Sequence, residues 1–251
     1  MTLAALGMYP FAHLRGAYDR LWAAVRTRLD LVDAPEGLSW DVDVHESWRD
    51  PALVLGQACG WPLATVLTGV VAVIGSFDVV APFAHDGRYR SVIVARRPLS
   101  VHELRAAPGV RAAVNGLDSL SGWVSLCAVW GGRPPVIVET GAHVQSMHAV
   151  AVGDADVASI DAVTFEHAVS ADPRLGAALH VVDHGPLVPT LPLVCAASRA
   201  STVGVLRAAI DGALADPAMG ATCQALRIRR LVPFGREAFD GLLGLAPPSG
   251  G

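Results

Sequence analysis

The sequence predicts an α/β protein built from two lobes. Strand-like runs alternate with helix-like runs along most of the 251 residues, which is the pattern of layered α/β domains with a largely parallel sheet. Two long extended runs, 89–97 and 190–198, are suited to carry the chain from one lobe to the other and back. We therefore expect a discontinuous lobe of residues 1–88 and 196–251, a continuous lobe of residues 89–195, and hinge strands at the two extended runs.

The first lobe should open with a strand-like run at 3–11 and a helix over 14–29. Apolar side chains three or four positions apart give this helix one buried face. The alternation of polar and apolar residues in 38–44 predicts a half-buried strand, and the apolar run 52–57 predicts a buried one. A helix follows it, with Pro62 in the first turn, where proline is tolerated. The apolar face of the first helix comprises Leu14, Tyr18, Leu21, Trp22, Val25 and Leu29.

The second lobe repeats one arrangement three times, a short strand followed directly by a helix. Its first helix is preceded by Ser100 with Glu103 three positions later, the spacing of a capping box. Helix-forming segments near the C-terminus, at 201–217 and after Pro233, complete the first lobe. The three strand and helix pairs are 111–115 with 118–130, 136–140 with 141–153, and 156–161 with 162–169.

Composition argues against a nucleic-acid partner and against direct membrane insertion. The net charge is −4, every basic residue is an arginine, and the longest basic run is only the RIRR of 227–230, so electrostatic support for nucleic-acid binding is small. No apolar run reaches the roughly 18 residues that span a bilayer. The sequence as it stands shows no signal peptide. It therefore predicts a cytoplasmic protein, or a periplasmic or cell-surface one if a leader has been removed.

No catalytic residue, cofactor or metal site is predicted. The sequence contains no GxSxG, GxGxxG, P-loop or HExxH pattern, which are the common signatures of catalytic and nucleotide sites. The four cysteines lie far apart without a CxxC pair, so neither a zinc site nor a redox motif is indicated. His143 and His148 are five positions apart, which does not place them on one helical face for metal binding.

Polar residues gather where predicted strands pass into helices, and this pattern predicts an anion site. A helix start leaves about four backbone N–H groups without partners and carries partial positive charge, so it favours bound anions. Serine hydroxyls add further donors, and Gly122 permits close approach of the backbone. The candidate ligand-binding residues are Tyr9, Gln57, Asn115, Ser119, Ser121, Gly122, Thr140, His143, Ser146 and Asp161.

The same residue types also serve as ordinary helix caps, so each junction has two interpretations. Serine and aspartate before a helix are common N-caps, each worth about 1 kcal/mol. Asp161 could accept a hydroxyl or amine of a ligand, or cap the helix that follows it. His143 lies in the first turn of its predicted helix, where the dipole disfavours a charged ring. A neutral His143 that donates one hydrogen bond is therefore expected.

Several segments together resemble the PhnD-like solute-binding proteins of phosphate, phosphite and phosphonate ABC transporters. They are LVLGQACGWPL, YRSVIVARR, AAVNGLDSLSGW, TGAHVQSMHAVAVGDADVASIDAVTFE and PTLPLV, in the same order over about residues 5–240. The resemblance implies a type II periplasmic-binding-protein fold with two α/β lobes, two hinge strands and closure on a ligand.

The resemblance also implies roles for individual residues. Ser119, Ser121 and Gly122 match the Ser-Thr-Ser-Gly loop that surrounds the phosphonate oxygens in that family, with Leu120 in place of the threonine. His143 and Asp161 correspond to the histidine and aspartate of the family's ligand cleft.

The function expected from these features is a non-enzymatic protein that closes on a small oxyanion or phosphonate-like ligand between its lobes. Its partners would be that small anionic ligand and an ABC transporter permease. Two alternatives remain at this point, a cytoplasmic enzyme on the same fold that acts on a small anionic metabolite, and a ligand-sensing regulatory module.

Overall fold

Two mixed β-sheets, each flanked by helices, organise the chain. The protein is represented by a computed structural model that describes residues 2–31 and 33–247. Met1, Val32 and residues 248–251, which the predicted first lobe includes, lie outside the described residues. The first unit comprises the described residues up to Val80, Ala84–Arg88 and Pro189–Gly241. The second unit comprises Ala81–Phe83, Tyr89–Val188 and the described residues from Leu242 onward.

The sheet of the first unit has the strand order β1-β2-β11-β3-β12. Strands β1 and β2 are parallel, whereas β11 runs antiparallel to β2 and β3, and β12 runs antiparallel to β3. The strands are β1 (Leu3–Ala5), β2 (Leu53–Gln57), β3 (Val71–Val79), β11 (Pro192–Ala196) and β12 (Ile228–Val232).

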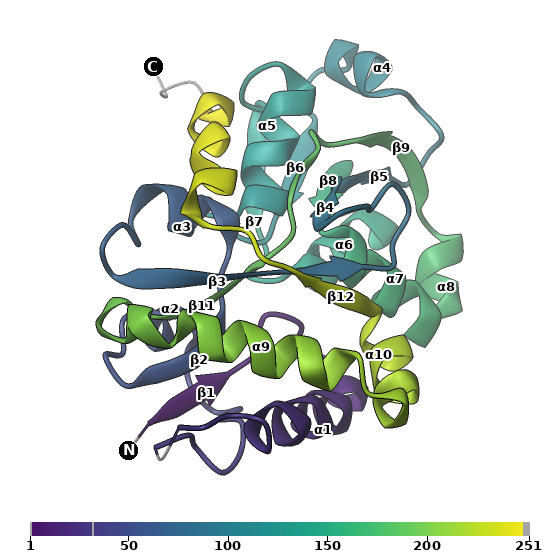
Figure 1. The fold of residues 1–251 in the computed structure, drawn as a ribbon. Coiled ribbons are helices and arrows are strands. Elements are labelled where there is room, and N and C mark those ends of the chain that lie inside the picture. The colour runs from purple at the N-terminus through teal and green to yellow at the C-terminus, as the bar shows by residue number, and fades with distance from the viewer. Residues whose placement is uncertain (1, 32, 248–251) are drawn as a thin grey trace. The chain divides into compact units, whose positions relative to one another are not determined.

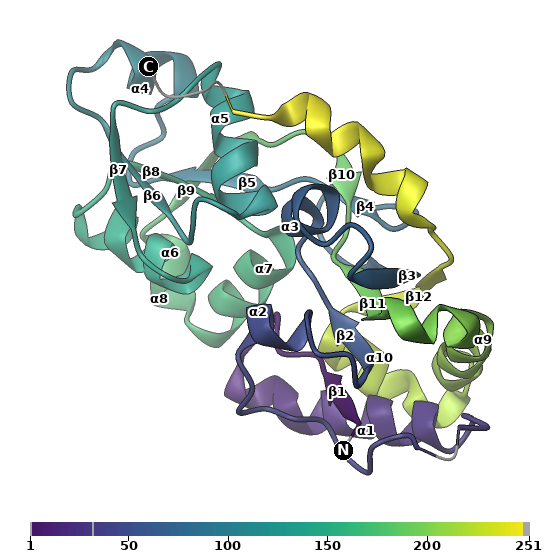
Figure 2. The same cartoon turned by 90° about the vertical axis from the view of Figure 1, so that its left-hand side faces the viewer.

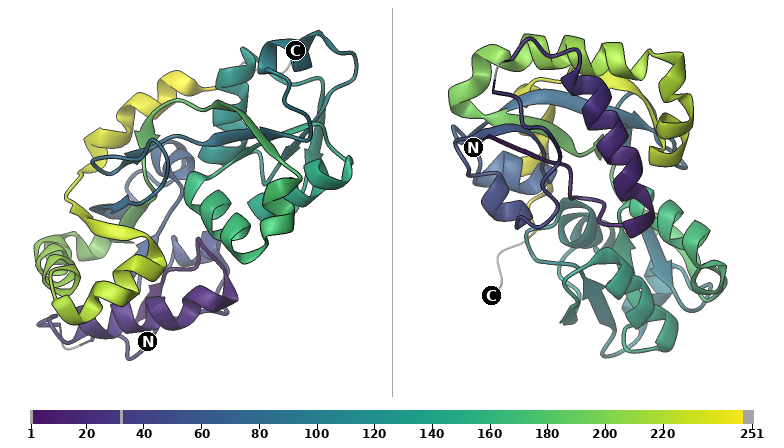
Figure 3. Two further views of the ribbon diagram at one scale, coloured as in Figure 1. Left: turned by 90° about the vertical axis from the view of Figure 1, so that its right-hand side faces the viewer. Right: turned by 90° about the horizontal axis from the view of Figure 1, so that it is seen from below.

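Helix α9 packs against β3 and β12, and α1 packs against α9 and α10; α9 and α1 lie side by side in Figures 1 and 3. The predicted apolar face of α1 is buried through Tyr18, Leu21, Trp22 and Val25. The helices of this unit are α1 (Arg15–Arg26), α2 (Val44–Ser47), α3 (Gly60–Thr65), α9 (Val203–Leu214), α10 (Gly220–Leu226) and the 3-10 helices η1 (Ala12–Leu14), η3 (Ala197–Thr202) and η4 (Pro217–Met219). A further 3-10 helix, η5 (Arg236–Leu245), ends in the second unit.

The sheet of the second unit has the order β7-β6-β8-β5-β9. Strands β6, β7 and β8 are parallel to one another, and β5 is antiparallel to β8 and β9. The strands are β5 (Val92–Ala95), β6 (Arg111–Val114), β7 (Val136–Glu139), β8 (Val157–Ile160) and β9 (His180–His184).

Helices cover both faces of this second sheet, with α4 and α5 on one side and α6, α7 and α8 on the other (Figure 2). The capping box predicted at Ser100 and Glu103 is confirmed at the start of α4, and α6 ends at the left-handed Gly153 as the sequence indicates. The helices are α4 (Val101–Ala106), the π-helical turn η2 (Leu120–Val124), α5 (Ser125–Trp130), α6 (His143–Val152), α7 (Ala162–Ala171) and α8 (Pro173–Ala177).

The prediction of a strand over 38–44 is wrong. This segment contains no strand, and α2 begins at Val44. Its polar side chains are used locally instead, because Asp43 accepts a hydrogen bond from the Glu46 N–H at 3.0 Å and caps α2. The Trp40 indole donates to Asp19 Oδ1 at 2.9 Å. Local capping thus outweighs the alternating pattern.

The expectation of a largely parallel sheet is wrong for the first unit, where three of the four strand pairings are antiparallel. In the second unit only β5 runs against the other four strands. The antiparallel pairs include β3 with β11 in the first unit and β5 with β9 in the second, and these are the strands that lead out of or into a unit. Adjacent strands by which a chain leaves and returns must run in opposite directions. A short pair, β4 (Arg88–Tyr89) with β10 (Val188–Pro189), lies where the chain passes between the units.

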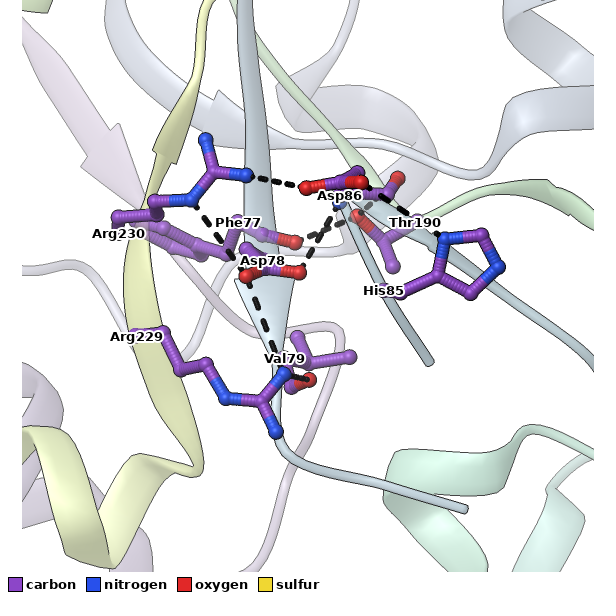
Figure 4. Close-up of polar contacts among 9 residues, drawn as sticks. Phe77, Asp78, Val79, His85, Asp86, Thr190, Arg229 and Arg230 are labelled. Atoms are coloured by element: carbon purple, nitrogen blue, oxygen red, sulfur yellow. Dashed lines mark hydrogen bonds and ion pairs between the residues drawn. The ribbon is translucent and has the colours of Figure 1, made fainter. Parts of the chain in front are cut away.

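A buried carboxylate in the first unit secures the segment where the chain turns back after β3 (Figure 4). Asp78, with only 7% of its side chain exposed, accepts the Gly87 N–H at 3.1 Å and faces Arg230 at 3.6 Å. Arg230 also pairs with Asp86 at 2.7 Å. Asp86 and Gly87 have positive φ angles of 49° and 70°, which are the conformations of a tight two-residue hairpin turn.

Thr190 connects the returning chain to the same turn. Its hydroxyl donates to the Phe77 carbonyl at 2.7 Å, and its N–H donates to the Gly87 carbonyl at 2.8 Å (Figure 4). We call Asp78, Asp86, Gly87, Thr190 and Arg230 the Asp78 cluster. The cluster holds the outgoing and returning segments of the chain on the first unit.

The substitution Asp78→Ala should lower the free energy of unfolding by about 1–3 kcal/mol, because it leaves the buried Gly87 N–H without an acceptor. The control is Asp86→Asn, since the Asp86 side chain is 79% exposed and such surface ion pairs contribute at most about 1 kcal/mol. Asparagine also tolerates the left-handed backbone at this position. Urea unfolding of both variants is the measurement, and equal losses would contradict the assigned role of Asp78.

Candidate functional site

Three parallel strands of the second unit end at the same edge of its sheet, and the predicted site residues follow them. Asn115 comes directly after β6, Thr140 after β7 and Asp161 after β8. Because parallel strands carry their carboxyl ends to one edge, ligands of α/β sheets bind there. The structure thus brings the three predicted junctions of the second lobe together.

The Ser119 loop begins a helix through a side-chain cap. Ser119 Oγ accepts the Gly122 N–H at 3.0 Å, and the Ser119 carbonyl accepts the N–H groups of Trp123 and Val124. The helix opens with the π-helical turn η2 and continues without interruption into α5. Single π-helical turns occur often at functional sites. The hydroxyl of Ser119 keeps its own hydrogen as a donor, since capping uses only its oxygen.

Ser121 and His143 form a direct hydrogen bond between neighbouring helix starts. The distance from Ser121 Oγ to His143 Nε2 is 2.8 Å, and His143 is the first residue of α6. The Ser159 hydroxyl donates to the Ser121 carbonyl, which fixes the backbone of the loop. Burial lowers the pKa of His143 below its ordinary value, against opposing contributions from the Asp161 carboxylate and the Ser159 carbonyl. The neutral ring predicted from the helix dipole agrees with this direction.

Gly122 lies where no side chain fits. A Cβ atom at this position would stand 1.9 Å from Asn115 Oδ1 and 3.1 Å from Ser119 Oγ. The Asn115 carboxamide therefore packs directly over the Gly122 backbone. Asn115 Oδ1 is buried and has no hydrogen-bond partner among the described residues. Glycine is required here by close packing of a polar side chain.

Thr140 and Ser146 use their hydroxyls mainly for each other. Thr140 Oγ1 lies 2.7 Å from Ser146 Oγ, and it also donates toward the Val114 carbonyl at 3.1 Å. The Thr140 N–H bonds to the same carbonyl at 2.8 Å. These contacts tie the end of β7 to the end of β6 and to α6.

Asp161 is buried and serves as the N-cap of α7. Its carboxylate accepts the Thr164 N–H and the Tyr89 hydroxyl, each at 2.8 Å. Tyr89 is a residue that sequence reasoning missed, and its position in an extended run gives no signal of this contact. The capping interpretation of Asp161 is therefore realised, with a tyrosine hydroxyl added to the site.

The two remaining predicted residues, Tyr9 and Gln57, lie in the first unit. Gln57 ends β2, and Tyr9 follows β1, which is parallel to β2. The Trp48 indole donates to the Gln57 carbonyl at 2.9 Å, a contact that the sequence did not indicate. Gln57 Oε1 is buried and has no hydrogen-bond partner in the part of the chain that the structure describes. Gln57 is thus the last residue of its strand, and Tyr9 lies four residues beyond the parallel strand β1.

Over residues 2–31 and 33–247, the side chains form no cluster of three or more groups suited to hold a metal ion. None of the helices in this described part is both long and apolar enough to cross a membrane.

Two α/β units with polar residues at the carboxyl ends of parallel strands define the class of substrate-binding proteins with a type II periplasmic-binding fold. A family model described as "ABC transporter, phosphonate, periplasmic substrate-binding protein" matches residues 67–238, more than half of the chain. The chain belongs to this family. Its PhnD-like character, expected from the sequence, is confirmed, and the binding-protein function is favoured over the enzyme and the sensing module.

Solved structures with low sequence identity share the fold. PhnD1 from Prochlorococcus marinus in complex with methylphosphonate has a TM-score of 0.75 at 13% identity, over 98% of this chain and 96% of that one. A binding protein component of an ABC phosphonate transporter from Pseudomonas aeruginosa has a TM-score of 0.75 at 14% identity, over 98% and 84%. XAC2383 from Xanthomonas citri, bound to ATP, has a TM-score of 0.70 at 14% identity, over 98% and 97%. No curated protein sequence matched the chain.

The substitution Gly122→Ala should destabilise the protein by about 1–3 kcal/mol, the usual cost of overpacking. The matched control is Gly204→Ala near the start of α9, where an added Cβ would meet nothing within 4 Å and helix propensity should leave stability unchanged or higher. Adding Asn115→Ala to Gly122→Ala should recover part of the loss, as measured by chemical unfolding. No recovery would show that Asn115 is not the obstructing group.

The lowered pKa of His143 should make folding stability fall more steeply with acid than in a variant without this ring. Above the unfolded pKa of about 6.5 both states are neutral, and below it only the unfolded state gains a proton, so stability is lost as pH decreases. We expect the difference in melting temperature between pH 7.5 and pH 5 to shrink in His143→Gln. It should be unchanged in His148→Gln, an exposed residue of the same helix. The same difference in all three proteins would refute the assignment.

Proposed function

We propose that this substrate-binding protein holds a small phosphorus oxyanion of the phosphonate class at the Ser119 loop. The observation that carries the proposal is the Ser121–His143 hydrogen bond of 2.8 Å between two helix starts, at the edge where three parallel strands end. Donors that converge at helix N-termini favour a bound anion. The family and the methylphosphonate complex of PhnD1 support the same ligand class.

Each residue of the loop has a role in this proposal. The Ser119 and Ser121 hydroxyls donate to ligand oxygens, and Gly122 lets the backbone approach them. Asn115, Thr140 and Ser146 shape the strand ends around the loop, through the contacts described above. His143 lies beside Ser121 as the neutral partner of its hydroxyl.

Three further residues are proposed to contact the non-phosphorus part of the ligand. Asp161 with its Tyr89 partner supplies an acceptor group in the second unit. Tyr9 and Gln57 are the proposed ligand contacts of the first unit, and the buried unpaired Gln57 Oε1 supports a ligand that brings a hydrogen-bond donor. An unpaired buried oxygen costs stability until such a donor arrives.

The protein's proposed partner is the permease of an ABC transporter, to which it delivers the bound oxyanion. This proposal rests on the family to which the chain belongs. Membership of this family also supports a periplasmic or cell-surface location, because proteins that serve such a permease act on the outer side of the membrane. If the permease is the partner, the protein should co-purify with it when ligand is present and not when ligand is absent.

Thermal unfolding against a panel of oxyanions tests the proposed ligand. A ligand that binds only the folded state at 100 times its Kd stabilises it by about 2.7 kcal/mol, which raises the melting temperature by several degrees. Phosphate, phosphite, methylphosphonate and aminoethylphosphonate should include at least one stabilising ligand, and sulfate and small carboxylates should give smaller shifts. A flat response to all phosphorus compounds would reject the proposal.

Variants then locate the site. The double variant Ser121→Ala/His143→Ala should lose most of the ligand-induced shift while it keeps a melting temperature near that of the wild type without ligand. The matched control is Ser201→Ala/His148→Ala, because both of these residues are exposed. Titration calorimetry of the two double variants provides the affinities, and unchanged affinity in the first would remove Ser121 and His143 from the site.

A further inference from the structure

The helical segment η5 carries the chain from the first unit into the second. Gly241 is assigned to the first unit, and Leu242, the next residue, to the second. The segment is the yellow helix near the C-terminal end in Figure 1. All ten of its residues, Arg236–Leu245, lie in one 3-10 helix. Such helices seldom continue beyond about four residues, because their hydrogen bonds have poorer geometry than those of an α-helix.

The first half of η5 is fastened to the first unit. The Arg236 guanidinium donates to the Leu63 carbonyl at 3.0 and 2.9 Å and to the Thr68 hydroxyl at 2.7 Å. The Phe239 side chain is buried, and its ring meets that of Phe234 edge to face, with 6.4 Å between the ring centroids. All of these residues belong to the first unit. A change of conformation in η5 would therefore displace its far end, which belongs to the second unit.

The burial of side chains along η5 follows a period of three. Phe239 and Leu242 are only 1% and 3% exposed, and Arg236 and Leu245 are half-buried. Leu243, in contrast, is 54% exposed. Side chains three positions apart lie directly above one another in a 3-10 helix. The buried line of η5 is therefore the one that a 3-10 helix produces.

The same residues would also form an amphipathic α-helix. In an α-helix, residues three and four positions apart share one face, so Phe239, Leu242 and Leu243 would lie together. Leu243 would then join the buried face, and Leu245 would leave it. Because one leucine replaces another, both conformations bury a similar apolar area. The hydrophobic effect thus gives neither conformation a large advantage.

Two glycines reduce the advantage that an α-helix would otherwise have. Gly241 and Gly244 are exposed, and an added Cβ at either position would meet nothing within 4 Å, so packing does not require glycine there. Each costs about 1 kcal/mol relative to alanine inside an α-helix. The two are three positions apart, where side chains would eclipse in a 3-10 helix. The glycines therefore weaken the α-helix and ease the 3-10 helix, which brings the two closer in free energy.

We propose that η5 is a connection with two states, the 3-10 helix described here and an α-helix, and that ligand binding shifts the balance between them. The rise per residue is about 2.0 Å in the first state and about 1.5 Å in the second, so ten residues shorten by about 5 Å. This inference rests on the proposed function, in which residues of both units contact the ligand. Binding then favours one arrangement of the units, and with it one length of η5. By thermodynamic reciprocity, a change that favours one state of η5 must alter ligand affinity.

Two leucine substitutions move the balance in opposite directions. Leu243→Ser removes a side chain that is buried only in the α-helix, and Leu245→Ser removes one that is buried only in the 3-10 helix. In titration calorimetry with methylphosphonate, one variant should bind about 5-fold more weakly than the wild type, the lower end of the usual coupling between sites. The other should bind at least as tightly as the wild type. Unchanged affinity in both variants, or equal losses in both, would overturn the inference.

Asp240→Asn is the matched control, because Asp240 is an exposed residue of η5 that lies on neither apolar face. It should leave the affinity unchanged. Melting temperatures without ligand identify any variant that fails to fold.

NMR of the wild-type protein observes the two states directly. Short distances from an Hα to the N–H four residues later are specific to the α-helix, and those to the N–H two residues later indicate the 3-10 helix. Methylphosphonate should change the relative intensity of the two sets within η5. An unchanged pattern when methylphosphonate binds would overturn the inference.

The proposed function can fail separately. If no phosphorus oxyanion stabilises the wild type, the proposed function is rejected. The variants Leu243→Ser and Leu245→Ser should even then shift the NMR pattern of η5 in opposite directions, and the same pattern in both would reject the two states themselves.

Discussion

The parallel direction of β6, β7 and β8 is the constraint on which the rest of the candidate site depends. Because these three strands run together, the residues that follow them arrive at one edge of the sheet. The helices that follow must then begin at this edge, so their positive ends are oriented alike. The Ser119 loop and His143 follow β6 and β7, so they could not meet if one of these strands were reversed. The anion binding proposed for this site thus depends on topology before any particular side chain is considered.

Capping and ligand binding draw on the same residue types, and the structure shows how one residue can do both. Ser119 uses its oxygen to cap the helix at Gly122 and retains its hydrogen. Asp161, in contrast, accepts from both a backbone N–H and the Tyr89 hydroxyl, and a carboxylate has enough lone pairs for another donor. The two interpretations that the sequence left open at each junction are therefore compatible. The contacts that stabilise the helix starts thus leave both side chains able to take the proposed role in recognition.

Local signals predicted the parts of the fold that local chemistry controls. The capping box of Ser100, the end of α6 at Gly153 and the strand and helix pairs of the second unit follow from short-range patterns. The strand predicted over 38–44 is wrong because the alternation of polar and apolar residues there comes from a helix cap and from packing residues. Tyr89 and the Ser121–His143 pair could not be predicted from spacing, since 72 positions separate Tyr89 from Asp161 and 22 separate Ser121 from His143. Such residues meet only in the tertiary fold.

The placement of charged residues bears on how the proposed site would discriminate among anions. Arginine is the only basic residue besides histidine in this chain. Its described contacts are with carboxylates, carbonyls, threonine hydroxyls and rings, as in the Asp78 cluster and the pair of Arg111 with Asp156. Among the described residues, none of these arginine contacts involves the side chains of Ser119, Ser121 or His143. A guanidinium attracts any anion at long range. Neutral donors at fixed positions instead bind well only an oxyanion whose oxygens lie within hydrogen-bond distance of them. A binding protein that recognises one oxyanion among many depends on this second kind of interaction. The placement of arginine in structural contacts and of serine at the strand ends is consistent with that requirement.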